Sequence, residues 1–309
     1  MTHAHDDEHA PEPVLREVSE GVFAYVQLDG SWGLNNTGFF VGRDGVVVID
    51  TCFTERRSRA FVDSVRSVTD RPLRTLVNTH HHGDHTHGNW LLPEATIIGH
   101  ELCRSAVIES GHAASGLFPG VDWGNIPITP PFVTFEERLQ LHVDELGVEL
   151  QFQGPAHTTN DVVAWVPERR LLFAGDLVFN GGTPFVVMGS VSGSIAAVER
   201  LQALGAETIV PGHGDVCGPE VLQDQISYLR FVQSLAKHAV AAGMGALEAA
   251  RSCDLGRFAE WHDTERLVGN LHRAIAEERG LTPGGDLDIL TAISEMIAFN
   301  DGKPLRCLA

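Results

Sequence analysis

The chain has 309 residues, of which 43% are hydrophobic and 20% are charged, a composition typical of a soluble globular protein with a sizeable core. Its formal net charge of −19 argues against nucleic acid or an anionic membrane as a partner, since both repel an acidic surface. No apolar run approaches the roughly 18 to 20 residues that span a bilayer.

The first 13 residues, MTHAHDDEHAPEP, predict a short disordered tail at positions 1–13. They contain neither the basic region nor the apolar stretch of a secretory signal. The five cysteines are scattered, odd in number and free of any CxxC pair, which is typical of reduced thiols and not of a disulfide framework. Together these features predict a cytoplasmic protein.

Residues 14–218 alternate between short β-branched runs and amphipathic helical segments. The run GVVVIDT at 45–51 is almost continuously apolar, which indicates a strand buried on both faces. Runs of the same shape follow: RTLVNTH (74–80), VELQFQGPAH (148–157), RLLFAGD (170–176) and ETIVPGH (207–213). Helical spacing predicts helices over 55–70 and 194–206, so the alternation indicates a layered α/β core.

After residue 218 the pattern becomes helical throughout. Apolar residues recur at helical spacing over 221–243, 264–279 and 287–300. No linker rich in Pro, Gly or Ser separates this part from the core. We therefore expect residues 219–309 to form a helical C-terminal extension packed on the core.

Histidines concentrate in NTHHHGDHTHGN at 78–89, and further candidate ligands end three later strand-like runs. Strand ends at one edge of an α/β fold converge on a single cleft, so these side chains are expected to meet. Imidazole and carboxylate without thiolate suit two divalent cations, most readily Zn²⁺ and also Fe or Mn. A central carboxylate can bridge such a pair, which can share a water and lower its pKa toward 7. The candidate metal ligands are His80, His82, Asp84, His85, His157, Asp176 and His213.

This ordered set resembles the metallo-β-lactamase superfamily over roughly residues 14–218. The resemblance implies an α/β fold, the αββα sandwich, with the metals at one edge. It further implies His80, His82 and His157 on the first metal, Asp84, His85 and His213 on the second, and Asp176 between them. Asp84 and Asp176 become the candidate catalytic carboxylates, and Asp50 matches an aspartate that supports the histidine loop. His81 and His87 lie off the motif, and packing or solvent exposure is the expectation for both.

Several members of the superfamily fit the sequence less well than others. Secreted β-lactamases need an export signal, and the flavin-linked diiron enzymes place glutamate at the position of His82. A glyoxalase-II-type thioesterase shares the full ligand set and has C-terminal helices, so a general dinuclear-zinc hydrolase of thioesters or lactones is one alternative. A protein that holds metal without turnover is another, although a structural site would be closed and need one metal only.

A narrower resemblance involves segments outside the ligands. GLFPGVDWGNIPITPPFVTFEERLQLHV, GPAHTTNDVVAWVPERRLLFAGDLVF and the terminal RCLA are similar to second-ring cyclases of actinomycete type II aromatic polyketide pathways, the actinorhodin cyclase type. The resemblance implies an antibiotic-biosynthesis enzyme that closes the second ring of a polyketide tethered to an acyl carrier protein and releases it by thioester hydrolysis. Metal cations can support that aldol closure because they polarise a carbonyl and stabilise an enolate.

A bulky, flat substrate needs an apolar pocket with a few polar groups. Aromatic residues in Gly- and Pro-rich segments are the candidate lining residues: Trp32, Phe118, Trp123, Phe179 and Phe185. Asn35, Asn160 and Asn180 are candidate polar anchors.

The predicted helix over 55–70 and the residues that follow it carry a local positive charge. Residues 55–74 contain six arginines and three acidic residues, which gives a net charge of 6 − 3 = +3. This segment can dock an acidic carrier protein or can simply be a solvated helix face. The sequence carries no signal for an oligomeric state.

Overall fold

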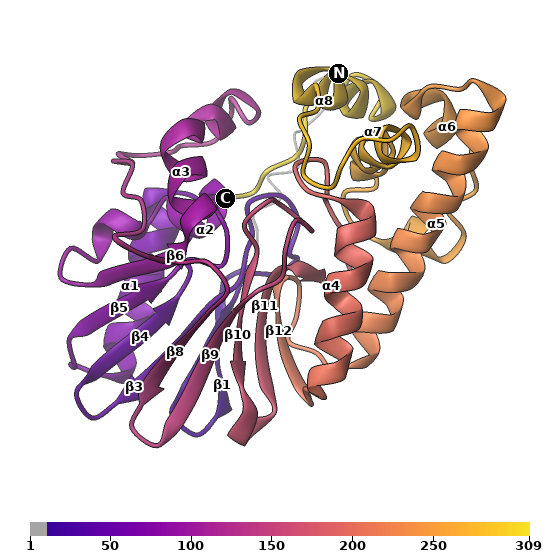
Figure 1. Ribbon diagram of the computed structural model, residues 1–309. Coiled ribbons are helices and arrows are strands. Elements are labelled where there is room, and N and C mark those ends of the chain that lie inside the picture. The colour runs from indigo at the N-terminus through magenta and orange to yellow at the C-terminus, as the bar shows by residue number, and fades with distance from the viewer. Residues whose placement is uncertain (1–10) are drawn as a thin grey trace.

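The computed structural model of the protein describes residues 11–309 (Figure 1). Two β-sheets face each other, one with the strand order β1-β2-β3-β4-β5-β6-β7 and the other with the order β12-β11-β10-β9-β8. Helices cover the outer faces, which gives the αββα layering. The α/β sandwich predicted from the sequence is therefore confirmed.

The first sheet is antiparallel at its start and parallel at its end. Strands β1 to β4 pair antiparallel, and β4, β5, β6 and β7 pair parallel. Parallel pairing requires crossover connections, and α1 (Glu55–Val68) makes the one between β4 and β5. The strands are β1 (Val14–Ser19), β2 (Val22–Val26), β3 (Thr37–Gly42), β4 (Gly45–Ile49), β5 (Leu73–Val77), β6 (Thr96–His100) and β7 (Val133–Phe135).

The second sheet pairs antiparallel from β8 to β11, and β12 is parallel to β11. The crossover between these last two strands contains α4 (Val191–Leu204). Strand β10 is buried along its whole length, which explains its unbroken run of apolar residues. The strands are β8 (Arg138–Val143), β9 (Leu146–Phe152), β10 (Val162–Val166), β11 (Leu171–Phe179) and β12 (Thr208–His213).

Separate hydrophobic clusters hold the four layers together. Between the sheets, Phe40 of β3 packs on Phe173 of β11 with ring centroids 5.5 Å apart. Outside the first sheet, Phe61 and Val65 of α1 pack on its strands. α4 and the start of α5 (Glu220–Ala242) pack on the outer face of the second sheet. The apolar residues that recur at helical spacing in the sequence are thus the ones that each helix buries against its sheet.

The three helical segments predicted after residue 218 correspond to α5, α7 (Arg266–Glu278) and α8 (Ile289–Phe299), and a short helix that was not predicted, α6 (Ala246–Ser252), lies between α5 and α7 in the chain. They have their own apolar cluster, which also includes Phe53, Phe118 and Phe185 from the sandwich. In Figure 1 these helices lie beside α4 at the end of the second sheet. The helical region is therefore joined to the sandwich by packing next to the predicted site.

The end of the chain returns to the first sheet. Arg57 of α1 donates hydrogen bonds to the carbonyl of Leu308 (2.7 Å) and to Oε1 of Gln27 (2.8 Å). A disordered tail was expected at positions 1–13. Positions 1–10 lie outside the described residues, and positions 11–13 have no regular secondary structure. Among residues 11–309, no helix combines the length and apolarity needed to span a membrane.

Candidate metal centre

The seven predicted ligands come from four places in the fold. His80 follows β5, and His82 immediately precedes α2 (Gly83–Thr86), a single helical turn that carries Asp84 and His85. The remaining three lie in the second sheet or next to it: His157 in the loop after β9, Asp176 in β11, and His213 at the end of β12. Asp176 was expected to end its strand, but β11 continues to Phe179 past an irregular register with β12, so this carboxylate projects from inside the strand.

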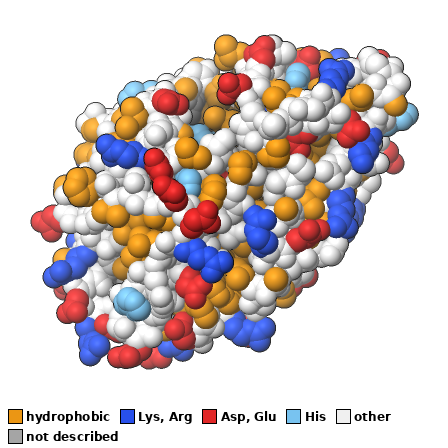
Figure 2. Space-filling model, viewed as in Figure 1, with side chains coloured by type: hydrophobic (Ala, Val, Ile, Leu, Met, Phe, Trp, Pro, Cys, Tyr) orange, Lys and Arg blue, Asp and Glu red, His pale blue; other side chains and the backbone are white. Residues whose placement is uncertain are grey.

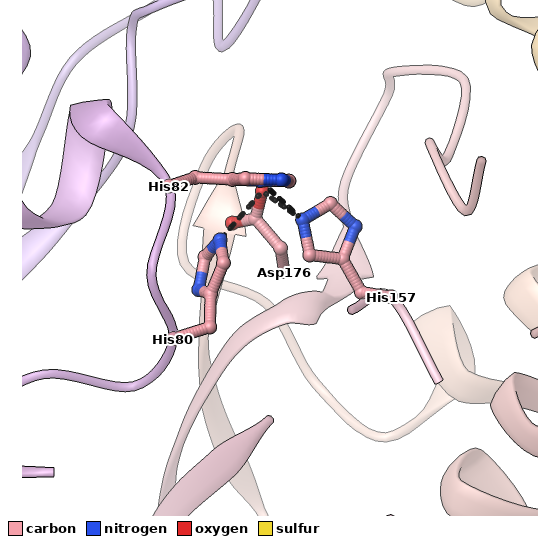
Figure 3. Close-up of side chains that lie close together, drawn as sticks. All are labelled: His80, His82, His157 and Asp176. Atoms are coloured by element: carbon pink, nitrogen blue, oxygen red, sulfur yellow. Dashed lines mark hydrogen bonds and ion pairs between the residues drawn. The ribbon is translucent and has the colours of Figure 1, made fainter. Parts of the chain in front are cut away.

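His80, His82, His157 and Asp176 form the first cluster, drawn in Figure 3, where all four side chains point toward one another. Their potential ligand atoms lie within 4.8 Å of one another. His82 Nδ1 lies 2.9 Å from His157 Nε2, and His157 Nε2 lies 3.3 Å from Asp176 Oδ2. Convergence of three imidazoles on one carboxylate is a geometry suited to a divalent cation.

Asp84, His85 and His213 form the second cluster, with the same 4.8 Å limit on the distances between ligand atoms. His213 Nε2 lies 3.3 Å from Asp84 Oδ2. Asp176 lies between the clusters, because its Oδ1 is 3.0 Å from His85 Nε2 and its Oδ2 is 3.3 Å from His213 Nε2. One carboxylate thus contacts imidazoles of both groups, as a bridging ligand must.

Buried polar atoms without a hydrogen bond show that these residues fit metal ions. Among the described residues, His80 Nε2, His85 Nε2 and Asp176 Oδ1 are buried and have no hydrogen-bond partner. Buried polar atoms are almost always satisfied, so three such atoms within the two clusters indicate a missing partner that accepts their lone pairs. Imidazole nitrogen and carboxylate oxygen are the donors that Zn²⁺, Fe and Mn accept.

In three of the clustered histidines, the ring nitrogen that points away from the centre, Nδ1, has a hydrogen-bond partner that fixes the orientation of the ring. His85 Nδ1 donates to Asp50 Oδ2 (2.8 Å), His213 Nδ1 donates to the carbonyl of Gly30 (3.1 Å), and His157 Nδ1 donates to the carbonyl of Phe185. Each of these bonds leaves Nε2 as the free atom facing the centre. The predicted supporting role of Asp50 thus has a geometric basis, since its carboxylate also accepts from the backbone and hydroxyl of Thr79 (2.7 Å each).

Two glycines allow β11 and β12 to approach each other at the centre. Gly175 has φ +51°, in the left-handed region where a side chain is strained. A Cβ added at Gly212 would collide with Asp176 Oδ1 and with the backbone of Gly175. The small residues beside the ligands are therefore needed for close packing of the two strands.

Burial and opposite charge together set the ionisation of the site. Burial alone would raise the pKa of Asp176, but the charges of His213 and His85 hold it well below its ordinary value. Burial would lower the pKa of His213, yet Asp176 and Asp84 raise it to about 9. His80 and His82 have a pKa well below the ordinary value because burial and neighbouring imidazoles disfavour their charged forms. Without a cation, His80 and His82 are therefore neutral, whereas His213 carries a proton that it must release before its nitrogen can bind a metal ion.

A cavity of about 100 Å³ opens above the two clusters. Both clusters contribute to its floor, and its walls are mostly aromatic. Four of the predicted lining residues are there: Trp32, Phe118, Phe179 and Phe185. Trp32 lies on the connection between β2 and β3, and its ring centroid is 5.0 Å from that of Phe185 and 5.7 Å from that of Phe118.

The other four predicted pocket residues have different roles in the structure. Trp123 packs edge-on against Phe53, with centroids 4.7 Å apart. Asn35 is buried and donates to the carbonyl of Thr51 (2.8 Å). Asn180 donates to the carbonyl of Asp215 (2.9 Å). Asn160 faces His81 Nδ1 at 3.0 Å, away from the cavity. The amides of the three asparagines thus form hydrogen bonds within the protein, and the sequence alone does not distinguish such an amide from one that contacts a ligand.

The two histidines of the loop that lie outside the ligand motif are buried, the first of the two alternatives expected for them. His81 is buried against Asn160, and His87 is stacked on Phe53 with centroids 5.5 Å apart. His87 Nδ1 also donates to the carbonyl of Phe53 (3.1 Å). Both side chains thus support the loop without facing the clusters.

Sequence reasoning did not find Phe53 and Arg266, which also line the cavity. Phe53 follows β4 three residues after Asp50, a strand-end position that could have been recognised. Arg266 begins α7, far along the chain, and its guanidinium lies 4.0 Å from the centroid of the Trp32 ring. The neighbouring Glu265 accepts a hydrogen bond from Trp32 Nε1 (2.7 Å). The C-terminal helices therefore hold one wall of the cavity, and no local motif signals this.

The fold and the two clusters define an αββα protein with a candidate dinuclear metal centre at one edge of the sandwich. Residues 30–213 match the family described as the metallo-beta-lactamase superfamily, and the chain belongs to this superfamily.

Individual relatives differ in what their names describe. The chain is 30% identical over 210 residues to the 2,4-dinitroanisole O-demethylase subunit alpha of Nocardioides sp. (strain JS1661), covering 65% of this chain and 56% of that one. It is 31% identical over 177 residues to a hydroxyacylglutathione hydrolase of Rhodospirillum rubrum, covering 57% and 60%. The chain thus spans little more than half the length of these curated relatives. A solved metallo-beta-lactamase from Pontibacter korlensis shares the fold, with a TM-score of 0.59, 20% identity, and coverage of 71% of this chain and 99% of that one.

Proposed function

We propose that the protein is a metal-dependent hydrolase that cleaves a thioester at a dinuclear centre. One observation carries the proposal: seven side chains from four separate segments converge in two clusters, with Asp176 between them, on the floor of an open cavity. Two divalent cations, for which Zn²⁺ is the first candidate and Fe or Mn the alternatives, would supply Lewis acidity that polarises a carbonyl and makes a water acidic.

The chain's own residues divide the remaining tasks. Asp176 would hold the two metal positions at a fixed separation because it contacts imidazoles of both clusters. Asp84 lines the cavity and its side chain is 14% exposed, so we assign it the acceptance of a proton from the attacking water. The aromatic walls would exclude bulk water and orient the acyl group.

The comparisons support hydrolysis more directly than any other reaction. The relative from Rhodospirillum rubrum is named hydroxyacylglutathione hydrolase, and its name describes the hydrolysis of a hydroxyacyl derivative of glutathione. The same ligand types in this chain can serve a related reaction. The cytoplasm remains our proposed location, and all five cysteines are free, as in a reducing compartment.

A second candidate is a cyclase that closes the second ring of a carrier-bound aromatic polyketide and then hydrolyses its thioester. The observation that favours it is the aromatic wall formed by Trp32, Phe53, Phe118, Phe179 and Phe185, since flat aromatic rings stack well on such surfaces. The chemistry of the centre is compatible with both candidates, because each requires a polarised carbonyl and a proton acceptor.

The proposed carrier-docking arginines over 55–74 are partly engaged within the molecule. Arg57 is buried, Arg59 pairs with Glu55 (2.7 Å), and Arg66 donates to the carbonyl of Arg71 (2.6 Å). On the face drawn in Figure 2, acidic and basic side chains are intermixed with hydrophobic ones between them. A charge-reversal test of docking should therefore change Arg56 and Arg59 and leave Arg57 intact, because reversal of a buried arginine would damage the fold.

The experiment is to load metal-free protein with Zn²⁺ and follow thiol release from an acyl thioester. About two equivalents of bound metal, with thiol release lost on chelation and restored by Zn²⁺, would support a dinuclear hydrolase. Stoichiometric metal binding without thiol release would indicate a protein that only holds metal. A thioester of a polyketide with its first ring closed separates the candidates: a bicyclic product supports the cyclase, and the open acid alone supports the general hydrolase.

A further inference from the structure

Residues 183–188 lie in the connection between β11 and α4 and contact the first metal cluster. The carbonyl of Phe185 accepts the hydrogen bond from His157 Nδ1, and Met188 Sδ lies 3.4 Å from His82 Nε2. In both rings this contact is made by the nitrogen that faces away from the cluster, since His82 Nδ1 and His157 Nε2 face each other at 2.9 Å (Figure 3). The segment thus contacts two of the ligand rings on the side away from the metal position.

The backbone of residues 183–187 is buried and belongs to neither a helix nor a strand. Its N–H and C=O groups therefore need partners from elsewhere in the fold. Asn270 of α7 supplies two at once, because its Nδ2 donates to the carbonyl of Pro184 (2.7 Å) and its Oδ1 accepts from the N–H of Val186 (2.9 Å). The Asn270 side chain is fully buried. Its two bonds lie on either side of Phe185, the residue whose carbonyl fixes the histidine ring.

Two buried arginines of α7 bind the same segment on either side of that asparagine. Arg273 donates from both Nε (3.0 Å) and Nη2 (2.8 Å) to the carbonyl of Val187. Arg266 donates from Nη1 to the carbonyl of Thr183 (3.0 Å). Positions 266, 270 and 273 share one face of a helix, so α7 runs alongside the segment and binds its backbone from residue 183 to residue 187.

The chain just beyond this segment is anchored in a different way. The N–H of Ser190 donates to the carbonyl of Ala156 (2.7 Å), and a Cβ added at Gly189 would meet that carbonyl at 2.0 Å. Residues 189 and 190 are therefore fixed by close packing on the loop that carries His157. The peptide groups around Phe185, in contrast, are held by the polar face of α7.

We infer that Asn270 and Arg273 are positioning residues for the first metal position, because they hold residues 183–187 where the Phe185 carbonyl fixes the His157 ring. The inference rests on the proposed metal centre and gives the C-terminal helices control of its affinity. Without this carbonyl, the His157 ring rotates or carries its proton on Nε2, and a protonated nitrogen does not bind a cation. Loss of such a supporting partner lowers metal affinity by about 10- to 100-fold.

Asn270→Leu tests this role, because leucine fills a similar volume and makes neither bond to the segment. Stepwise Zn²⁺ titration against a competing chelator measures both metal affinities, and urea unfolding of the metal-free protein measures stability. The matched control is Tyr228→Phe. The hydroxyl of the fully buried Tyr228 accepts from the same Asn270 amide (2.9 Å), so its removal takes away a buried hydrogen bond and leaves both bonds to the segment intact.

Asn270→Leu should lower one metal affinity by about tenfold or more and leave the other unchanged. Asp50→Asn acts on the second position, since Asp50 accepts from His85, so the double variant should be weakened at both metals. Tyr228→Phe should lose stability without a change in either affinity. Two unchanged affinities in Asn270→Leu, or a double variant weakened at one metal only, would overturn the inference.

Arg273 provides an independent test in case Asn270→Leu does not fold. Arg273→Lys keeps the charge and one donor for the Val187 carbonyl, whereas Arg273→Met keeps neither, so the same metal affinity should fall less in the lysine variant. Wild-type affinities in both Arg273 variants would overturn the inference. The titrations need no substrate, so a wild type that binds two metals and cleaves no thioester would overturn the hydrolase proposal alone. A wild type that binds no Zn²⁺ would overturn both.

Discussion

Replacement of Asp50 by Asn tests whether this buried carboxylate controls the second metal position. Asp50 Oδ1 accepts from the Thr79 backbone, and Oδ2 accepts from both the Thr79 hydroxyl (2.7 Å) and His85 Nδ1 (2.8 Å). Asn has the same shape and also tolerates the φ of +59° found here, so the substitution adds no backbone strain.

The amide cannot satisfy all three donors. If its oxygen faces the Thr79 backbone, its NH₂ group faces His85 Nδ1–H, and two donors oppose each other. The alternative is a change of tautomer, in which Nδ1 accepts from the amide and Nε2 carries the proton and cannot bind a cation. We expect an affinity loss of about 10- to 100-fold for one metal, the range for such supporting partners, which is about 1.4 to 2.7 kcal/mol. The metal-free protein should lose about 1 to 3 kcal/mol of stability.

Asp161 provides a matched control close to the same centre. It is equally buried and accepts from the backbone (2.8 Å) and hydroxyl (2.7 Å) of Thr158, but within residues 11–309 it accepts no hydrogen bond from an imidazole. Stepwise Zn²⁺ titration against a competing chelator measures both affinities, and urea unfolding of the metal-free proteins measures stability. Equal metal affinities for Asp50→Asn and Asp161→Asn would refute the reasoning.

Three further predictions concern metal removal, close packing and the wall of the cavity. Chelation should lower the Tm, since a metal at 100 times its Kd contributes about 2.7 kcal/mol to the folded state, and an unchanged Tm in calorimetry would contradict this. Gly212→Ala should reduce the bound metal measured by elemental analysis, because its Cβ meets Asp176 Oδ1, whereas exposed Gly120→Ala should not. Arg266→Met should cost about 3 to 5 kcal/mol in urea unfolding, because it leaves Asp263 buried without the cation 2.8 Å away, and added Asp263→Asn should restore part of that loss.

Many of the helices and strands could be predicted from local sequence, because each of them buries a regular face and therefore has a periodic pattern of apolar residues. The predicted helix over 55–70 corresponds to α1 at Glu55–Val68, and the helix over 194–206 corresponds to α4 at Val191–Leu204. β11 was predicted too short, since nothing local shows that a strand continues past a glycine in the left-handed region. The strand order and the pairing of β11 with β12 depend on contacts distant in sequence.

The seven side chains that meet in the two clusters could be named from the sequence, because metal binding demands particular donor atoms and each candidate donor follows a recognisable strand-like run. The aromatic residues of the cavity could be named only in part, because an aromatic side chain in a loop can face a pocket or pack on a neighbour with equal chemistry. Trp32 faces the cavity, whereas Trp123 packs on Phe53.

Tertiary structure alone decided how distant parts of the chain combine at the site. The sequence determined which atoms can bind metal, since that is a property of the residues themselves. Only the folded chain brought Glu265 and Arg266 of the C-terminal region against Trp32. These contacts join segments separated by 233 positions or more, so they follow from packing of whole layers and leave no pattern in any local stretch of sequence.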